Sequence, residues 1–340
     1  MPIVPGQNLG SYEVVEEIGR DGTVTVYKGY HAGLTRHVTI KVLPVFHPDG
    51  PSFRARFQRE AKTVARLRHP NIPSVYDYGD QDDVTYLISE HLDGGTLVEH
   101  LGAPMPPEIC AGILRPIASA LDYAHSLGIV HRDVKPSSVL MTGDGRILLA
   151  NFGIARIVGD VKGLSQGGLS VGTPEYMAPE QAMEDNVGPA ADVYSLAVVA
   201  YQMLTGDVPY SGETPLAIIL AHIHNPLPLP RDRNPDLPEA VQDVLVKGLA
   251  KQPEGRYQSA GEFVEALGQA LAEDRNGPIA VAGGVIGTGP PGSAAASGVR
   301  HAAHEPGPKL RPVDLIVAAC LGIVAMVVVA VLLLGARGQV

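Results

Sequence analysis

The sequence is short of cysteines and of basic side chains, and both shortages exclude classes of protein. Cys110 and Cys320 are the two cysteines in 340 residues, too few for a disulfide framework or a cysteine-rich zinc site. Lys and Arg total 26 against 36 acidic residues, a formal net charge of −10, which argues against a general nucleic-acid binder. Hydrophobic residues still make up 45% of the chain, so a packed core is expected.

The sequence also shows no signal peptide at its first residues and no internal repeat. The first residues, MPIVPGQNLGSYE, lack the charged n-region and the long apolar run of a signal peptide. No internal repeat is visible in the sequence. The mean hydropathy of +0.09 is nevertheless high for a chain with 29 prolines and 39 glycines, so apolar residues must be concentrated somewhere.

That concentration is an apolar run at residues 315–334, LIVAACLGIVAMVVVAVLLL, which contains no charge. As a helix it would be roughly 30 Å long, the thickness of the hydrocarbon core of a bilayer. A buried core helix usually carries polar positions, so the run predicts a transmembrane helix, followed by a short tail at 335–340. Lys309 and Arg311 precede the run and Arg337 follows it, a slight bias that favours a single-pass cell-membrane protein with its body in the cytoplasm.

The segment at residues 274–314 is rich in Gly, Pro and Ala and contains few large apolar residues. This composition predicts a flexible juxtamembrane linker. The folded body is therefore expected at about residues 8–273.

Within the body, the pattern of apolar residues changes from strand-like to helical along the chain. Short β-branched segments bounded by Gly or Asp predict strands at residues 14–19, 24–30, 37–43 and 84–92. Helical periodicity predicts helices at residues 52–67, 107–127, 191–204, 214–222, 239–250 and 260–272. We therefore expect an α+β fold of two lobes, a small β-rich N-lobe at 8–91 with one helix and a large helical C-lobe at 92–273, with a cleft between them.

A series of motifs follows this framework in a fixed order. In chain order they are VTIK ending at Lys41, the helix residue Glu60, HRDVKPS at 131–137, NFG at 151–153, GTPEYMAPE at 172–180, ADVYSLA at 191–197 and a late Arg256. From about residue 12 to 271, the chain resembles the Hanks-type (eukaryotic-like) bacterial serine/threonine protein kinases of the membrane-anchored kind. The resemblance implies a bilobal protein-kinase-like fold.

The resemblance also implies roles for four charged residues. Lys41 would contact the α- and β-phosphates of a nucleotide, and Glu60 would pair with Lys41 to hold it there. Asp133 would orient the substrate hydroxyl or accept its proton, and Lys135 would steady the transferring phosphate. These two are the expected catalytic residues.

Other residues are expected to bind the nucleotide or to support the fold. The nucleotide-binding set implied by the family is Gly19, Val26, Lys41, Glu60, Glu90 and Leu92, with Ser89 before the hinge as a small gatekeeper. The structural set is His131 as a packed core residue, Asp192 bonded to the backbone of the HRD turn, and Glu180 paired with Arg256. ATP is therefore a possible ligand.

Three departures from the family pattern fall on positions that serve phosphates and metal ions. The glycine-rich loop keeps Gly19 but places Asp21 where backbone N–H groups should approach phosphates. Asn151 replaces the metal-binding Asp of the DFG triplet, and Ser138 replaces the Asn that holds a second metal ion. No metal ligand of the family is therefore intact.

The cost of these departures can be estimated from one lost charge. At an effective dielectric constant of 20 and a separation of about 4 Å, a unit charge pair is worth about 4 kcal/mol. Even 3 to 4 kcal/mol lowers a rate by roughly 10² to 10³, and Mg²⁺ prefers anionic oxygen to an amide carbonyl. The sequence thus favours a pseudokinase, a scaffold or allosteric regulator for which Mg²⁺ or Mn²⁺ binding is doubtful. The alternative is a slow or atypical serine/threonine kinase that transfers the γ-phosphate of ATP to Ser or Thr hydroxyls. A third interpretation is a nucleotide-responsive switch that binds ATP without metal and changes the closure of the lobes.

The segment between NFG and APE suggests regulation by a partner. Ser165 and Ser170 lie in a Gly-rich stretch and are candidate phosphorylation sites for another kinase, with Arg132 placed to pair with the phosphate. Thr173 is expected to contact the catalytic Asp and Lys. The expected partners are proteins, including another kinase or a substrate, and the membrane through the C-terminal helix.

Overall fold

The computed structural model describes residues 3–21, 24–44, 50–81, 84–153, 173–183 and 187–275. The chain divides into two units, 1–279 and 280–340, and all described residues belong to the first. The expected linker after residue 275, the apolar run at 315–334 and the tail at 335–340 lie outside the described residues. Within the described ranges, no helix is both long enough and apolar enough to cross a bilayer.

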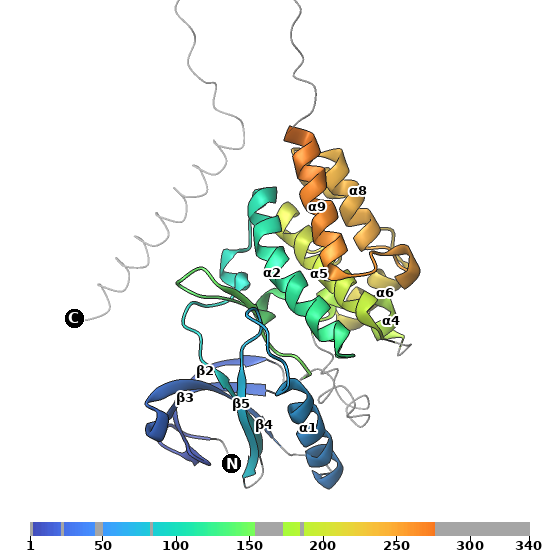
Figure 1. Cartoon of the computed structure of the whole chain (residues 1–340). Helices are drawn as coiled ribbons and strands as arrows, with labels where there is room; N and C mark the ends of the chain where they lie inside the picture. Colours follow the sequence, from blue (N-terminus) through green and yellow to red (C-terminus); the bar gives the residue numbers. More distant parts are fainter. Residues whose placement is uncertain are drawn as a thin grey trace, which may run out of the picture. The chain divides into compact units, whose positions relative to one another are not determined.

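The N-terminal part is an antiparallel sheet with strand order β1-β2-β3-β4-β6-β5 (Figure 1). Its strands are β1 (Asn8–Leu9), β2 (Tyr12–Asp21), β3 (Val24–His31), β4 (Arg36–Pro44), β5 (Val75–Gln81) and β6 (Val84–Glu90). The predicted strands within β2, β3, β4 and β6 are confirmed. These segments are rich in β-branched and aromatic residues, and alternate residues pack in a core that includes Val14, Val38 and Ile40.

One helix, α1 (Gly50–Val64), packs against β5 and β6 of this sheet. Phe57, Ala61 and Val64 recur on one side of α1 and are buried, as the 3.6-residue period of an amphipathic helix requires. The helix was predicted at 52–67, but it spans Gly50–Val64 and ends three residues earlier than predicted. Val64, at the end of the buried side of α1, lies close to Gly153. Gly153 follows a second, smaller sheet.

That second sheet is a two-stranded hairpin of β7 (Val139–Met141) and β8 (Ile147–Leu149). Its strands were not predicted because each has only three residues, too short for a periodic pattern. The HRD motif precedes β7 and the NFG triplet follows β8. The hairpin thereby brings the two motifs to the same end of a small sheet.

The C-terminal part is helical, and its helices are α2 (Pro107–Ser126), α4 (Pro179–Ala182), α5 (Pro189–Thr205), α6 (Pro215–His224), α7 (Pro230–Arg233), α8 (Glu239–Gly248) and α9 (Ala260–Arg275). Short 3-10 helices are η1 (Ala32–Leu34), η2 (Leu97–His100), η3 (Pro136–Ser138), η5 (Pro174–Tyr176) and η6 (Pro253–Gly255). The five longer predicted helices are confirmed to within a few residues at their ends. The four-residue α4 and α7 were not predicted.

Helix α5 forms the centre of the helical part, in contact with α2, α8 and α9 (Figure 1). Nearly all of its side chains are buried, because apolar residues occupy every side of the helix rather than one stripe. Pro189 begins the helix, and Gly206 ends it in the left-handed conformation with φ of 89°. The α+β class and the division into a β-rich and a helical part are as predicted. The HRD turn, which precedes β7, is hydrogen bonded to Asp192 of α5.

Candidate functional site

Lys41 lies near the C-terminal end of β4, where Val26 of β3 and Leu87 of β6 are its partners in register. Strand pairing on both sides fixes the backbone at this point. The Lys41 side chain is only 9% exposed. Its Nζ donates a hydrogen bond to Oδ1 of Asn151, a residue 110 positions later in the sequence. The described structure therefore joins the VTIK lysine directly to the NFG triplet.

Asn151 adopts a left-handed backbone conformation with φ of 72°. Asn tolerates this conformation better than most residues with a side chain. Gly153, two residues later, has φ of 75°, and a Cβ there would lie 2.7 Å from Cγ2 of Val64 on α1. The triplet therefore needs glycine at its third position, and it is held close to the end of α1.

Ser138 and Asn151, which we call the metal positions, are hydrogen bonded to each other. The Asn151 side-chain amide nitrogen lies 3.4 Å from the Ser138 hydroxyl, to which it donates. The same hydroxyl donates to the backbone carbonyl of Asp133 at 3.1 Å. With its oxygen on Lys41, the Asn151 amide thus uses both of its ends in contacts within the protein.

Asp133 and Lys135 lie together, with 3.0 Å between Oδ2 of Asp133 and Nζ of Lys135. The Lys135 side chain is 4% exposed and that of Asp133 is 21% exposed. Proline at position 136 begins η3, and the backbone turns there so that residues 133 and 138 face each other. The two expected catalytic residues are therefore adjacent, and the carboxylate of Asp133 keeps some access to solvent.

His131 ties the HRD turn to the chain before the NFG triplet. The ring is fully buried, and burial lowers its pKa, so the neutral form is favoured. Its Nδ1 accepts the backbone N–H of Asp133 at 3.2 Å, so the proton must reside on Nε2, which donates to the Ala150 carbonyl at 2.7 Å. His131 is thus a packed core residue, as predicted, and it fixes the backbone on both sides of the site.

Asp192 supports the same turn from the start of α5. Its buried carboxylate accepts the backbone N–H groups of His131 and Arg132, each at 2.8 Å. His125 of α2 contributes a third contact, with Nε2 at 2.7 Å from Asp192 Oδ2. Arg132 has a positive φ of 67°, a conformation that these bonds stabilise. The predicted bond from Asp192 to the HRD turn is confirmed.

Glu180 and Arg256 form a buried bidentate ion pair. The Arg256 Nη1 and Nη2 atoms lie 2.6 and 2.8 Å from the two Glu180 carboxylate oxygens. The guanidinium also donates to three backbone carbonyls, those of Ala190, Ala250 and Lys251. This pair was predicted from the sequence and is confirmed, and it joins the APE segment to the chain between α8 and α9.

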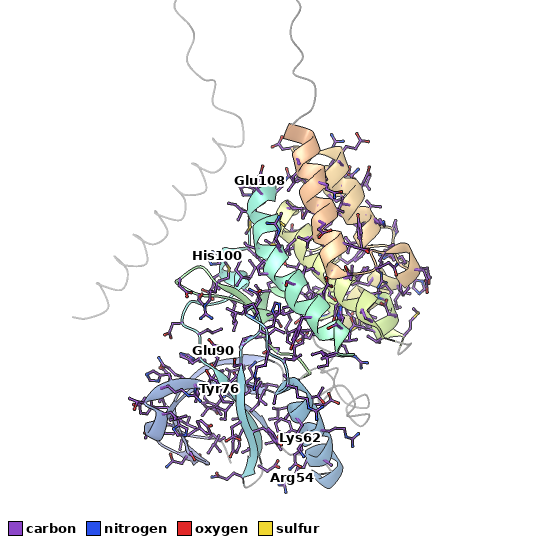
Figure 2. The ribbon with its side chains drawn as sticks, viewed as in Figure 1. Arg54, Lys62, Tyr76, Glu90, His100 and Glu108 are labelled. Atoms are coloured by element: carbon purple, nitrogen blue, oxygen red, sulfur yellow. The ribbon has the colours of Figure 1, made fainter. Side chains whose placement is uncertain are left out.

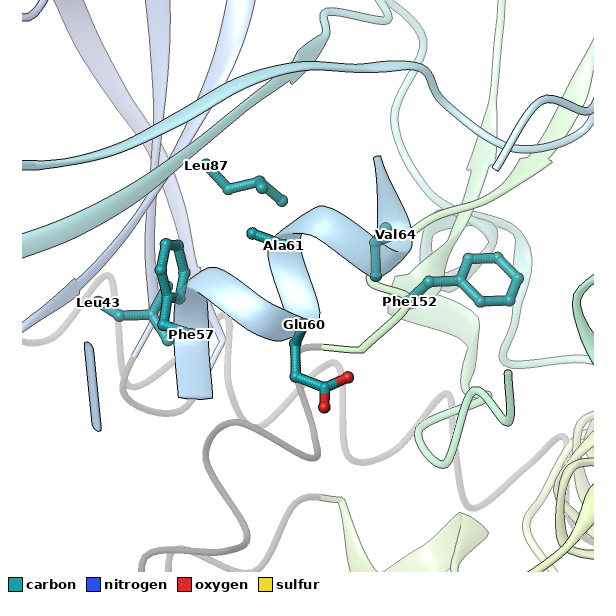
Figure 3. A pocket seen from close by; sticks show the side chains of 7 residues that line it. All are labelled: Leu43, Phe57, Glu60, Ala61, Val64, Leu87 and Phe152. Atoms are coloured by element: carbon teal, nitrogen blue, oxygen red, sulfur yellow. The ribbon is translucent and has the colours of Figure 1, made fainter. Parts of the chain in front are cut away.

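Glu60 lies on α1 at the border of a small cavity of about 10 Å³, the space of a single small molecule such as water (Figure 3). The other lining residues are apolar: Leu43, Phe57, Ala61, Val64, Leu87 and Phe152. In Figure 3 the Glu60 carboxylate extends away from the apolar side chains. Glu60 is therefore close to Phe152 of the NFG triplet, and its predicted pairing with Lys41 stays a prediction.

The residues expected to contact a nucleotide base and sugar lie on the sheet and just after it. Gly19 of β2 and Val26 of β3 are partners in register. Ser89 is 6% exposed and lies on β6 between Thr39 and Val75. Whether this small residue leaves space for a flat ligand, or a neighbouring aromatic fills the gap, stays open.

Glu90 ends β6 (Figure 2), and Leu92 lies two residues later, after the end of the strand. The Glu90 side chain accepts the backbone N–H of Ser74 at 3.3 Å and lies 3.6 Å from Nη1 of Arg146. Leu92 is half-buried. The carboxylate of Glu90 thus joins the end of β6 to Ser74 and Arg146, and the nucleotide contacts of Glu90 and Leu92 stay a prediction.

The predicted regulatory residues are described only in part. Ser165 and Ser170 lie outside the described residues. Thr173 is half-buried at the start of η5, and its predicted contact with Asp133 and Lys135 stays a prediction. Gln181 of α4 donates to the Arg132 carbonyl at 2.9 Å. Gln181 and His125 both position the HRD turn, and neither was predicted, because a single polar residue on a helix carries no sequence signal for a contact across the fold.

The donor set does not fit a divalent metal ion. Among the described residues, no group of three or more His, Cys, Asp or Glu side chains is placed to bind one. At the metal positions the amide oxygen of Asn151 already accepts from an ammonium group, and the Ser138 hydroxyl is already hydrogen bonded at both ends. Mg²⁺ requires hard, preferably anionic oxygen ligands in octahedral geometry. The ammonium groups of Lys41 and Lys135 do fit the phosphates of a nucleotide.

Comparison with known proteins gives one consistent result. Residues 12–267 match the family model described as the protein kinase domain. Serine/threonine-protein kinase PknB of Mycobacterium leprae is 38% identical over 259 residues, which cover 74% of this chain and 42% of that protein. Serine/threonine-protein kinase PknD of Mycobacterium tuberculosis is 39% identical over 269 residues, 78% of this chain and 40% of that protein.

A solved structure agrees with the fold. The crystal structure of the Mycobacterium tuberculosis PknI kinase domain matches with a TM-score of 0.64 and 33% sequence identity, over 79% of this chain and all of that one. The chain spans less than half the length of the curated relatives PknB and PknD.

Proposed function

We propose that this chain, which belongs to the protein kinase family in its Hanks-type bacterial serine/threonine branch, is a pseudokinase. It would be a kinase-like signalling protein with impaired Mg-ATP chemistry that scaffolds or allosterically regulates a protein partner. The observation that supports this proposal is the contact between the metal positions. Asn151 and Ser138 bond to each other and to Lys41 and Asp133 rather than presenting a carboxylate to a cation. The framework around them is that of a folded kinase domain.

A second candidate is a slow serine/threonine protein kinase, and one observation favours it. Asp133 and Lys135, which would orient a hydroxyl and steady a phosphate, are present and 3.0 Å apart. The relatives carry the name serine/threonine-protein kinase. On this candidate, Asp133 would hold the Ser or Thr hydroxyl of a protein substrate, and Lys135 would bind the phosphate oxygens.

Phosphotransfer by matched variants separates the two candidates. The full chain, purified in detergent, is assayed with ATP and either Mg²⁺ or Mn²⁺ beside the double variant Asn151→Asp, Ser138→Asn. If one lost carboxylate costs about 3 to 4 kcal/mol, the double variant gains roughly 10² to 10³ in rate over the natural chain. Asn225→Asp, which adds the same charge at an exposed position, is the matched control and should gain nothing.

One result would reverse the assignment, and a second would reveal a contaminating enzyme. A natural chain that turns over within about tenfold of the double variant is an active kinase. Activity that survives Asp133→Asn, both in the natural chain and in the double variant, would show that the measured phosphate transfer comes from a contaminating enzyme. The rate of the Asp133→Asn protein would then be subtracted before the natural chain and the double variant are compared.

We also propose that the body is anchored in the cell membrane, on the cytoplasmic side, by a helix at residues 315–334. The uncharged apolar run supports this location. The full chain should stay with membranes after alkaline extraction, whereas a chain lacking residues 315–334 should be released. Release of both chains would contradict membrane anchoring and leave the kinase-like assignment unaffected.

A further inference from the structure

At the positions that the family pattern assigns to the phosphates of a nucleotide, this chain has Asn151 in place of an Asp and keeps the lysines Lys41 and Lys135. We propose that this site binds the triphosphate of ATP without a divalent cation, so that free ATP rather than Mg-ATP is its ligand. The proposal rests on the proposed function, because it concerns the nucleotide site of a chain that does not depend on metal-assisted transfer. It also specifies the form of the ligand, which the family assignment leaves open.

Two buried ammonium groups supply the attraction. Lys41 lies on the sheet and Lys135 lies in the HRD turn, and both are buried. Both side chains are already confined by burial, so little side-chain freedom is lost when an anion binds. A charge at a buried position is also screened less by salt than one on the surface.

Asn151 changes the kind of group that the site offers. Its oxygen accepts from Lys41, and its amide nitrogen donates one N–H to Ser138. An amide nitrogen has two N–H donors, and the second suits a phosphate oxygen. A metal ion, by contrast, is repelled by a donor N–H. The Asn151 side chain is therefore suited to a direct contact with an anion.

A carboxylate at position 151 would reverse this preference. Two negative groups, the carboxylate and the triphosphate, approach each other only when a cation lies between them. With a neutral amide at this position, the carboxylate of the HRD turn is Asp133, whose charge is offset by Lys135 at 3.0 Å. Position 151 then adds no further negative charge to those of Asp133 and Glu60, so the need for an intervening cation is reduced.

The test is ATP binding to the full chain, measured by titration calorimetry in EDTA and in Mg²⁺. The natural chain should bind ATP with dissociation constants that agree within about threefold in the two conditions. Asn151→Asp should bind ATP at least about tenfold more weakly in EDTA than in Mg²⁺, because the carboxylate repels free triphosphate. Adenosine should bind at least about tenfold more weakly than ATP, because it lacks the phosphates.

A pair of lysine variants tests the source of the attraction. Lys41→Met should weaken ATP binding in EDTA by about tenfold or more. Lys62→Met removes the same charge from an exposed position on α1 and should leave the dissociation constant unchanged (Figure 2). Equal effects of the two variants would mean that the binding is a general charge effect, and this would overturn the proposal.

The remaining outcomes are decided by the natural chain alone, even if a variant fails to fold. ATP binding that requires Mg²⁺, or no ATP binding in either condition, overturns the proposal. Phosphotransfer assays on the same preparation keep the two claims separate. Fast turnover together with metal-independent ATP binding contradicts only the pseudokinase assignment. No turnover together with Mg²⁺-dependent ATP binding contradicts only the proposal that ATP binds without a divalent cation.

Discussion

Two polar regions of this protein have opposite characters. The C-lobe frame, Glu180, Asp192 and Arg256, consists of buried charges with their partners at 2.6 to 2.8 Å. The metal positions, Ser138 and Asn151, are uncharged and joined by a longer contact of 3.4 Å. The two regions are connected through His131, yet one keeps the charges of the family and the other does not.

The difference follows from what each charge does when no ligand is bound. Glu180, Asp192 and Arg256 satisfy buried groups of the protein itself, so removing one leaves another uncompensated in the core. At position 151 the side chain also accepts a hydrogen bond from the buried Lys41 ammonium, and an amide oxygen does this as a carboxylate oxygen would. We therefore expect the replacement of a carboxylate by an amide at this position to affect cation binding more than folding.

The largest expected effect is on the C-lobe frame. Arg256→Met leaves the Glu180 carboxylate, 4% exposed, without its partner. Breaking a buried pair in this way costs about 3 to 5 kcal/mol of unfolding free energy, which lowers Tm by about 10 °C in a domain of this size. Thermal unfolding followed by circular dichroism measures the change.

Two other variants show whether burial is the cause. Glu239→Gln breaks the exposed Arg231–Glu239 pair, 3.7 Å apart, and should change the unfolding free energy by less than about 1 kcal/mol. Asn151→Asp should also shift Tm less than Arg256→Met does. A larger loss for Asn151→Asp would mean that the metal positions, and not the frame, control folding.

A smaller effect is expected from pH, and it also arises in the helical part. His222 of α6 is 1% exposed, and its Nδ1 lies 2.8 Å from the Tyr194 hydroxyl. Burial, with a further contribution from the Lys251 ammonium, lowers the pKa of His222 to about 4. The rings of Tyr194 and Tyr210 face it from neighbouring elements.

The direction of the pH dependence follows from proton binding. In the unfolded chain the pKa of a histidine is about 6.5, so between pH 6.5 and 4 the unfolded state binds the extra proton. Stability is therefore complete above about pH 6.5 and falls as the pH is lowered to about 4, by on the order of 3 kcal/mol. His222→Asn should lose less Tm between pH 7 and pH 4.5 than the natural chain, and parallel curves for the two would contradict the assignment.

Several elements of the fold could be predicted because their signal is local. The strands within β3 and β4 are β-branched, and helices such as α2 and α5 are long enough to show their period. β5, VYDYGDQ, was missed because Asp and Gly disfavour strands. It forms at the edge of the sheet through pairing with β6, which the local sequence does not encode.

The candidate site could be predicted as a set of residues but not as a set of contacts. The motifs identify Lys41, Asp133, Lys135, Ser138 and Asn151, and the ion pair of Glu180 with Arg256 follows from the family pattern. The hydrogen bond from Lys41 to Asn151 joins residues 110 positions apart. No local preference specifies such a contact, because it depends on where the sheet and the hairpin place the two backbones.

The amino-acid sequence by itself determined the α+β division, the kinase motifs and the loss of the carboxylate at position 151. The tertiary structure decided what the substituted residues do in the absence of that charge. His131 fixes the backbone at Asp133 and Ala150, and close packing of Gly153 on Val64 holds the triplet against α1. Polar groups held together away from solvent must satisfy one another. Asn151 therefore bonds to Lys41 and Ser138, and the few basic side chains of this acidic chain include two that are buried, Lys41 and Lys135.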